Sequence, residues 1–342
     1  MTTISRRSTL FGMAAMAGTT VSAASSRKVR AAVIGLGHAH PFGKLNALRA
    51  LPQYELAGVF DGDPRLVEKS GAPLLTVDAI LKNPGIELAL IEGRVQDNLR
   101  YARMAVEAGK FVHLDKAPGE DLEDLKEILG EATRRKRVVQ MGYQWRYLSG
   151  MRQAIEAARK GWLGDVYLLR STIDKPIPST ERQELGRFRG GMMFELGCHI
   201  LDRAVDLFGA PRKVTGVLRH DSSYPDKLAD NTLAILEYER AIAEIHVAAM
   251  QPHGDQYRTF EILGSNGAAT LRAFNGKLAI DFKDAAGPYK AGQQVVEPQE
   301  QAGPVFAPDL IEMHRIICDG VSPSYSVEHD LTTEEALLRP TD

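Results

Sequence analysis

Three side chains that can take up or donate protons stand in two short segments of the chain. Lys116 lies in "VHLDKAPGEDL" (112–122), directly after an apolar run that is typical of a buried strand. Glu195 and His199 lie in "GGMMFELGCHILDRAVDLFG" (190–209), where a helix would place them on one face. A carboxylate beside an imidazole can fix its tautomer and tune its basicity. These residues fit general acid–base chemistry, although singly they also fit a surface lysine and an ordinary helix pair.

A glycine turn points to a dinucleotide cofactor. Residues 31–44 read "AAVIGLGHAHPFGK", an apolar strand followed by Gly35 and Gly37. Gly35 permits the tight turn, and Gly37 lets the backbone approach a pyrophosphate at the next helix N-terminus. Asp61 closes the second expected strand, where a carboxylate holds ribose hydroxyls and favours NAD over NADP. Nearby Arg65 keeps NADP open.

Two histidines interrupt this turn. His40 takes the place of the third glycine of the usual motif, and we expect it to pack at the helix start. His38 is predicted near the pyrophosphate, where it would add a donor or a charge; the alternative is that it packs or faces solvent. His113 lies in an expected strand and is predicted to be packed. No metal-ligand spacing of the usual kind appears, so we expect no metal site.

The elements that must position these residues begin with an α/β pattern. From Lys28 to about Gln140, apolar runs alternate with helical stretches, which indicates a parallel sheet buried on both faces. The expected strands are 29–35, 55–61, 87–92, 111–115 and 137–142. The expected helices are 42–51, 66–70, 77–82, 98–108 and 122–134. We therefore predict a doubly wound Rossmann domain over 28–143.

After about Trp145 the pattern changes to period-two alternation and hairpin turns. Antiparallel strand pairs are expected at 230–250 and at 258–273, the second with a turn at Ser265-Asn266-Gly267. The expected helices of this part are 149–160, 191–208 and 308–319, the last two backing the sheet, and 284–304 is expected to be a surface connection. Residues 144–338 are thus predicted to form an α+β substrate and oligomerisation domain with a large, mostly antiparallel open sheet.

Composition excludes several classes of function. The chain has 342 residues, of which 25% are charged, and a formal net charge of −2. It has no Lys/Arg block with interleaved aromatic residues, so a nucleic-acid partner is not expected. It also lacks an apolar stretch long enough to span a membrane. Cys198 and Cys318 are too few for a disulfide framework, and whether they pair stays open.

The N-terminus has the form of an export signal. Arg6 and Arg7 precede a mildly apolar run, and small residues end at Ala23. "SRRSTLF" is similar to the twin-arginine motif, with Thr9 where a large apolar residue is usual. We predict a twin-arginine signal peptide over 1–23, the alternative being a basic tail. The expected location is the periplasm or the exterior, and the expected cofactor is held tightly, because this machinery carries folded proteins.

Taken together, three motifs resemble the Gfo/Idh/MocA family of dehydrogenases over about 28–338. "DKAPG" matches the E-K-P segment of the family, with Lys116 on its lysine. "QMGYQWRY" (140–147) matches G-[FY]-x-x-R-[FY], and "GGMMFELGCHILD" matches G-G-x-x-x-D-x-G-x-H-x-x-D. The resemblance implies an enzyme that transfers hydride between nicotinamide and a sugar, an inositol or a related polyol. It also implies a homo-oligomer that associates through the open sheet.

The resemblance assigns a role to each site residue. His199 would be the general base for the substrate hydroxyl, and Lys116, beside the nicotinamide, would hydrogen-bond the same oxygen and stabilise its negative charge. Glu195 would orient His199 and bind a neighbouring hydroxyl. Tyr143 and Arg146 would line the substrate side.

Three departures from the family pattern affect the expected substrate and reaction direction. Glu195 replaces an aspartate, Pro118 is displaced by one residue, and "EGRVQDN" (92–98) replaces a T-P-x-x-x-H segment.

Two other functions stay open. One is an NAD-dependent enzyme that cleaves glycosides through transient oxidation, and the other is a dinucleotide-binding sensor without catalysis.

Overall fold

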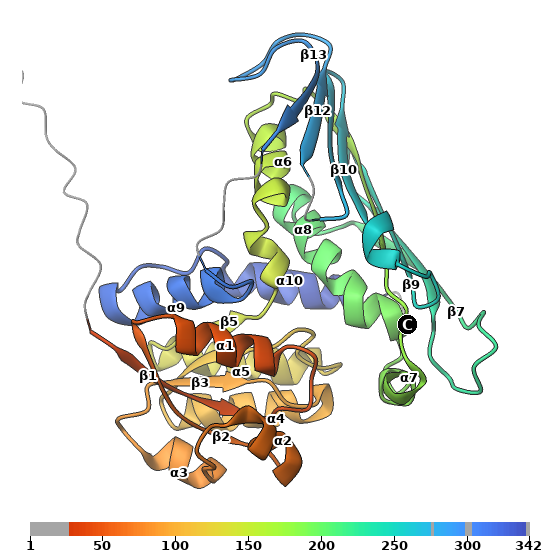
Figure 1. Ribbon diagram of the computed structural model, residues 1–342. Helices are drawn as coiled ribbons and strands as arrows, with labels where there is room; N and C mark the ends of the chain where they lie inside the picture. Colours follow the sequence, from red (N-terminus) through yellow and green to blue (C-terminus); the bar gives the residue numbers. More distant parts are fainter. Residues whose placement is uncertain (1–26, 275–276, 298–302, 340–342) are drawn as a thin grey trace, which may run out of the picture.

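The computed structural model describes residues 27–274, 277–297 and 303–339, which form two sheets with helices packed around and between them (Figure 1). The predicted signal peptide over 1–23 lies outside the described residues. Within the described ranges, none of the helices is both long and apolar enough to cross a membrane.

The first sheet has five parallel strands in the order β2-β1-β3-β4-β5. Its strands are β1 (Val29–Ile34), β2 (Tyr54–Phe60), β3 (Leu88–Ile91), β4 (Phe111–Leu114) and β5 (Val139–Met141). The strand order reverses between β1 and β3, and such sheets bind ligands at the carboxyl ends of the strands beside this switch point. All four residues of β3 are buried, as the unbroken apolar run predicts. The predicted Rossmann fold is confirmed.

Five helices of the first domain follow these strands. They are α1 (Pro41–Ala50), α2 (Pro64–Ser70), α3 (Val77–Lys82), α4 (Val95–Glu107) and α5 (Leu122–Arg134). Asp63 and Asp121 cap α2 and α5, since each carboxylate accepts a backbone N–H of the first turn. Helix α4 begins at Val95, earlier than predicted, so the segment after β3 turns directly into the helix at Arg94.

The second sheet has eight strands in the order β13-β12-β11-β10-β6-β9-β8-β7, antiparallel except for β6 and β9. Its strands are β6 (Val166–Asp174), β7 (Lys213–Arg219), β8 (Asn231–Glu237), β9 (Ile242–Ala248), β10 (Thr259–Gly264), β11 (Gly267–Arg272), β12 (Leu278–Phe282) and β13 (Gly292–Val296). Both predicted hairpins form, as β8–β9 and β10–β11. Strand β13 corrects the predicted surface connection, because its polar edge sequence lacks the apolar alternation that marks a strand.

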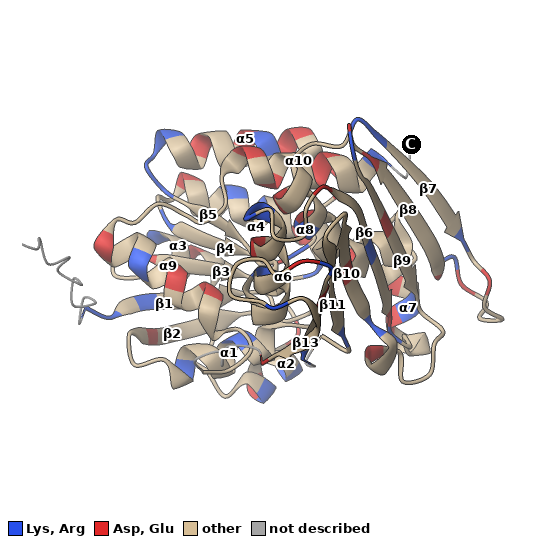
Figure 2. Ribbon diagram, turned by 90° about the horizontal axis from the view of Figure 1, so that it is seen from above, with Lys and Arg blue, Asp and Glu red and all other residues tan. Residues whose placement is uncertain are grey.

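The helices of the second half lie mainly on one face of this sheet. They are α6 (Ser149–Arg159), α7 (Ser179–Leu185), α8 (Cys198–Phe208), α9 (Ala307–Asp319) and α10 (Val327–Leu338), with short turns η1 (Gln144–Tyr147), η2 (Met193–Gly197) and η3 (Gly254–Tyr257). Figure 2 shows α6, α8 and α10 on the side of the second sheet that faces the first sheet. The described helices leave the other face open, and Ile242 on it is 48% exposed.

Helix α9 corrects the expectation that residues 308–319 back the second sheet. Its buried residues Ala307, Leu310 and Met313 belong to the apolar cluster formed by β1, α1 and their neighbours. The Tyr54 hydroxyl also donates to the carbonyl of Leu310 at 2.6 Å. The segment after the second sheet therefore returns to cover the Rossmann domain.

Candidate active site

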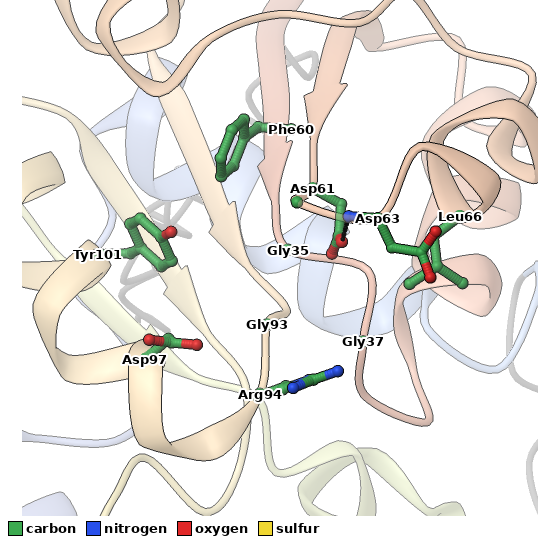
Figure 3. Close-up of a pocket in the computed structure, with 11 residues that line it drawn as sticks. Gly35, Gly37, Phe60, Asp61, Asp63, Leu66, Gly93, Arg94, Asp97 and Tyr101 are labelled. Carbon is green, nitrogen blue, oxygen red and sulfur yellow. Dashed lines mark hydrogen bonds between the residues drawn. The ribbon is translucent and has the colours of Figure 1, made fainter.

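A cavity of about 360 Å³ opens at the carboxyl ends of β1, β2 and β3. The predicted cofactor residues Gly35, Gly37 and Asp61 all line it, together with Arg94 and Tyr101 (Figure 3). This is the place that the glycine turn and the doubly wound fold reserve for a dinucleotide.

The close approach of two loops explains the need for glycine here. Gly35 has φ +90°, and a Cβ added to it would lie 2.2 Å from the Cα of Gly93. Asp61 holds the turn, since its Oδ2 accepts from the backbone N–H of Leu36 at 2.6 Å and its Oδ1 from that of Asp63 at 2.7 Å. Each carboxylate oxygen keeps a second lone pair for a ribose hydroxyl. The residues present therefore fit a dinucleotide.

Sequence reasoning missed that Arg94 and Tyr101 would line this cavity. Arg94 stands in the segment that departs from the family pattern, directly after β3, and its side chain reaches the glycine turn, with Cγ 3.2 Å from a Cβ built on Gly37. The ring of Tyr101 lies 6.2 Å from that of Phe60. The carboxyl end of a buried parallel strand was the signal that could have indicated Arg94.

Lys116 and Glu195 form a buried ion pair at the same edge of the sheet. The Nζ of Lys116 donates to Oε1 of Glu195 at 2.9 Å and to the backbone carbonyl of Glu195 at 2.7 Å. Burial lowers the pKa of Lys116, but the negative charge of Glu195 outweighs this effect and raises it. Burial raises the pKa of Glu195, but Lys116 and His38 outweigh it and hold this pKa far below its usual value. Both groups are therefore charged at neutral pH.

His199 is close to this pair, but the predicted orientation by Glu195 is wrong. Residues 193–197 form a π-helical turn before α8, which rotates Glu195 away from the face that His199 shares in a regular α-helix. Instead, the ring of His199 stacks on Trp145, with centroids 4.2 Å apart. Among the described residues, its Nδ1 has no hydrogen-bond partner. Burial and the charge of Lys116 lower the pKa of His199 well below its usual value, so the imidazole is neutral.

The resemblance implies that Tyr143 and Arg146 line the substrate side, but both side chains are buried. Arg146 donates to Oδ1 of Asp202 at 2.6 Å and to Oδ1 of Asp330 at 2.5 Å, and all three side chains are buried. The Tyr143 ring lies 4.9 Å from the Arg146 guanidinium and 6.0 Å from the His199 ring. Two buried carboxylates attract the guanidinium, which therefore joins η1 to α8 and α10. It does not face an open substrate side.

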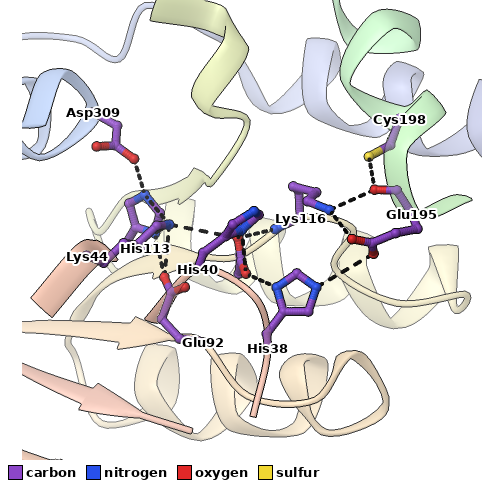
Figure 4. A network of polar contacts seen from close by, with 10 residues as sticks. His38, His40, Lys44, Glu92, His113, Lys116, Glu195, Cys198 and Asp309 are labelled. Carbon is purple, nitrogen blue, oxygen red and sulfur yellow. Dashed lines mark hydrogen bonds and ion pairs between the residues drawn. The ribbon is translucent and has the colours of Figure 1, made fainter. Parts of the chain in front are cut away.

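The two histidines of the glycine turn meet a carboxylate from the next loop. His38 Nδ1 lies 2.5 Å from Oδ2 of Asp115, and His40 Nδ1 lies 3.0 Å from its Oδ1 (Figure 4). His38 does not line the cavity of Figure 3, in contrast to the predicted place beside the pyrophosphate. His40 lies at the start of α1 and packs against Phe306, as predicted, but it also pairs with Asp115.

These three residues form a group that could hold a metal ion, whereas the ligand spacing in the sequence predicts no metal site. Ligand atoms of His38, His40 and Asp115 all lie within 4.8 Å of one another. Burial lowers the pKa of His38, but Asp115 and Glu195 outweigh it and raise this pKa to about 9. The sequence hid the cluster because Asp115 lies far along the chain from the His-x-His pair.

A second buried network continues behind this cluster, also shown in Figure 4. Lys44 Nζ lies 2.9 Å from Oε1 of Glu92, and His113 Nε2 lies 2.9 Å from Oδ2 of Asp309. Lys44 Nζ is also 3.1 Å from the ring of His113. His113 is buried, as predicted, but it lies among charged groups rather than in apolar packing.

Comparison with known families agrees with this geometry. The oxidoreductase family's NAD-binding Rossmann fold matches residues 29–143, and the GFO/IDH/MocA C-terminal domain matches residues 151–270. The chain belongs to the Gfo/Idh/MocA family. It is thus a member of an oxidoreductase family with an NAD-binding Rossmann domain.

Individual relatives are distant. The uncharacterized oxidoreductase YdgJ of Escherichia coli is 29% identical over 56% of this chain and 56% of its own length. Trans-1,2-dihydrobenzene-1,2-diol dehydrogenase of Bos taurus is 22% identical over 57% of both chains. The matched region thus spans little more than half of these relatives. Aldose-aldose oxidoreductase from Caulobacter crescentus, solved with glycerol, has the same fold, with a TM-score of 0.79, 21% identity and coverage of 92% of this chain and 98% of its own.

Proposed function

We propose that this member of the Gfo/Idh/MocA family is an NAD-dependent dehydrogenase that acts on a hydroxyl group of a sugar or polyol. The observation that carries the proposal is that the Lys116–Glu195 pair lies near enough to His199 for the charge of Lys116 to keep this buried imidazole neutral, beside the strand ends where the dinucleotide cavity opens. The names of relatives that act on a diol and on aldoses support this substrate class.

The two side chains divide the proton chemistry between them. A neutral imidazole can accept the proton of a substrate hydroxyl, so His199 is the general base for oxidation. Two N–H donors of Lys116 bind Glu195, and the third can donate to the substrate oxygen as it gains negative charge. A bound dinucleotide supplies the hydride acceptor. Glu195 keeps Lys116 charged and offers its carboxylate to a neighbouring hydroxyl.

The proposed preference for NAD rests on Asp61 and its surroundings. Its carboxylate suits ribose hydroxyls and repels a 2′-phosphate. Arg65, the cation that would accept such a phosphate, already pairs with Asp63 at 2.7 Å. We expect a lower Kd for NAD than for NADP, and titration of the protein with each dinucleotide, followed by intrinsic fluorescence, measures this.

Activity is tested by mass spectrometry for co-purified dinucleotide, followed by a panel of sugars and polyols monitored at the nicotinamide absorbance. On the best substrate, Lys116→Met and His199→Asn should each lower kcat/KM by about 10²–10⁴-fold. His199→Asn should keep NAD affinity, and Lys82→Met, which replaces an exposed lysine, should keep full activity. Full activity of the Lys116 and His199 variants would contradict the proposed site.

The same substrate panel separates the two alternative functions. Release of an aglycone without net formation of NADH would favour glycoside cleavage. Dinucleotide binding without either reaction would favour a sensor.

Export by the twin-arginine machinery stays part of the proposal and is supported by Arg6, Arg7 and the small residues before Ala23. The same reasoning gives a tightly held cofactor, because a folded protein can leave the cytoplasm with its dinucleotide already bound. Fractionation of cells that express the full chain tests this. Replacement of both arginines by lysine should retain the protein in the cytoplasm, whereas unchanged export would contradict a twin-arginine signal.

A further inference from the structure

The histidines of the glycine turn and the carboxylate after β4 form an arrangement that hydride transfer does not require. The chain bends between β1 and α1, so that His38 and His40 both turn Nδ1 toward Asp115. The three residues come from the carboxyl ends of two parallel strands, which bring distant segments to one edge of the sheet. Two imidazole nitrogens and one carboxylate thus converge on a common point (Figure 4).

The separations between His40 and Asp115 come close to a metal-binding geometry, whereas the separation between His38 and Asp115 is shorter. Bonds of 2.0–2.1 Å from imidazole and carboxylate to a tetrahedral Zn²⁺ place neighbouring ligand atoms about 3.3 Å apart. His40 Nδ1 lies 3.0 and 3.1 Å from the two oxygens of Asp115, and His38 Nδ1 lies 2.5 Å from the nearer one. A small outward movement of the His38 ring would therefore admit an ion.

The outer contact of His38 is the one that ligating histidines make. A metal-binding imidazole usually directs its other ring nitrogen to a carboxylate, which fixes the ring orientation. His38 Nε2 faces Oε2 of Glu195 at 3.6 Å, while its Nδ1 faces Asp115. The ring is thus held between an outer carboxylate and the point where the ligand atoms meet.

The charge of the buried network also favours a cation. Four buried carboxylates stand against two buried ammonium groups, and these six are Glu92, Asp115, Glu195, Asp309, Lys44 and Lys116. Apart from the imidazoles, these side chains carry two excess negative charges, and because the pKa of His38 is raised to about 9, a metal ion would replace the proton that this ring otherwise holds. Buried charges are stable only when they are paired or coordinate a metal, and one divalent ion would balance the excess.

We propose that His38, His40 and Asp115 bind a divalent transition-metal ion, Zn²⁺ in the first place, beside the Lys116–Glu195 pair. Two imidazoles and a carboxylate suit Zn²⁺, Co²⁺ and Fe²⁺ far better than Mg²⁺ or Ca²⁺, which prefer oxygen ligands throughout. The ion would join the β1–α1 turn to the loop after β4 through residues that do not themselves line the dinucleotide cavity.

The test uses the protein purified without a polyhistidine tag and treated with a chelator. Zn²⁺ binding is followed by calorimetry, and Co²⁺ binding by the visible ligand-field bands that report nitrogen ligands. We expect the wild type to bind one ion per chain. The affinity for Zn²⁺ should fall at least about tenfold in His38→Ala and in His40→Ala, because loss of a ligand weakens binding at least as much as loss of an outer contact. His246→Ala, which removes a half-exposed imidazole on β9, should bind as the wild type does.

Two results would overturn the proposal. One is that the wild type binds Zn²⁺ and Co²⁺ no more tightly than the double variant His38→Ala/His40→Ala does. In that case protonated imidazoles, and not a metal ion, balance the negative charge of the buried carboxylates. The other is a loss of affinity in His246→Ala equal to that in the His38 variant. Thermal unfolding of each variant shows that it is folded, and the wild-type titration decides the question even if a variant does not fold.

Discussion

The site residues work in protonation states that only their burial and neighbours produce. His199 is neutral because it is buried near the charge of Lys116, and Lys116 is charged because Glu195 outweighs its burial. A neutral imidazole and a charged amine thus coexist at neutral pH in the candidate site, as the proposed general base and hydrogen-bond donor require. The chemistry belongs to the group of side chains rather than to any one of them.

The lowered pKa of His199 has a consequence for stability. The unfolded chain takes up a proton at an imidazole near pH 6.5, whereas the folded chain does so only at lower pH. The free energy of unfolding should therefore fall below pH 6.5, by up to about 1.4 kcal/mol per pH unit for this group. Urea unfolding at pH 7.5, 6.5 and 5.5 should show that the wild type loses more stability below pH 6.5 than His199→Asn does, since the raised pKa of His38 adds the same opposite trend to both proteins. Equal slopes would mean that His199 is not held neutral.

Arg146 offers a second prediction, on stability. Arg146→Met leaves buried Asp330 without its arginine, while Asp202 keeps its ion pair with Arg203, and the loss should lower the free energy of unfolding by about 3 kcal/mol. The matched control is Arg170→Met, which removes an exposed arginine that pairs with Glu261 on the open face of the second sheet and should cost about 1 kcal/mol or less. Urea unfolding measures both, and similar losses would argue against a structural role for Arg146.

Among the elements, the turn between β1 and α1 does most to shape the site. It carries the glycines of the dinucleotide cavity and, directly after them, the two histidines that meet Asp115. The π-helical turn before α8 has a comparable effect, because it directs Glu195 to Lys116 and leaves His199 on Trp145. Small irregularities in regular elements therefore decide which side chains meet.

The glycine turn is tested by Gly35→Ala. A Cβ at this residue meets the backbone of Gly93, and the positive φ is unfavourable for alanine, so stability should fall by about 3 kcal/mol and NAD binding should be lost. Gly130→Ala, inside α5 and with no neighbouring atom within 4 Å, should be as stable as the wild type or more stable. Thermal unfolding and NAD titration of both variants check this, and an unaffected Gly35→Ala would contradict the close approach of the loops.

The whole molecule joins a covered sheet to an open one. Helix α9 returns from the second sheet to the Rossmann core, and α10 packs against both α8 and α5, so the two halves are tied by two helices. The outer face of the second sheet carries a row of apolar residues across three strands, Leu263 beside Leu168 and Leu168 beside Ile242. An apolar row on an open face suits association between copies of the chain.

We predict a homo-oligomer formed through this face. Ile242→Glu places a charge in the row and should convert the oligomer to smaller species, as measured by light scattering during gel filtration. Val327→Glu, at an exposed site at the start of α10, is the control and should leave the assembly unchanged. A monomeric wild type would contradict the prediction, as would an oligomer that both variants preserve.

The sequence by itself determined the class of both domains, the cofactor turn and the chemical groups of the site. Apolar runs, hairpin turns and the residues Gly35, Asp61, Lys116 and His199 carry these inferences, because local patterns and short motifs encode them. Tertiary structure decided which groups meet: Glu195 with Lys116 rather than His199, Arg146 with two carboxylates, and His38 and His40 with Asp115. Such pairings depend on the relative placement of strand ends and on a π-turn, which no short stretch of sequence specifies.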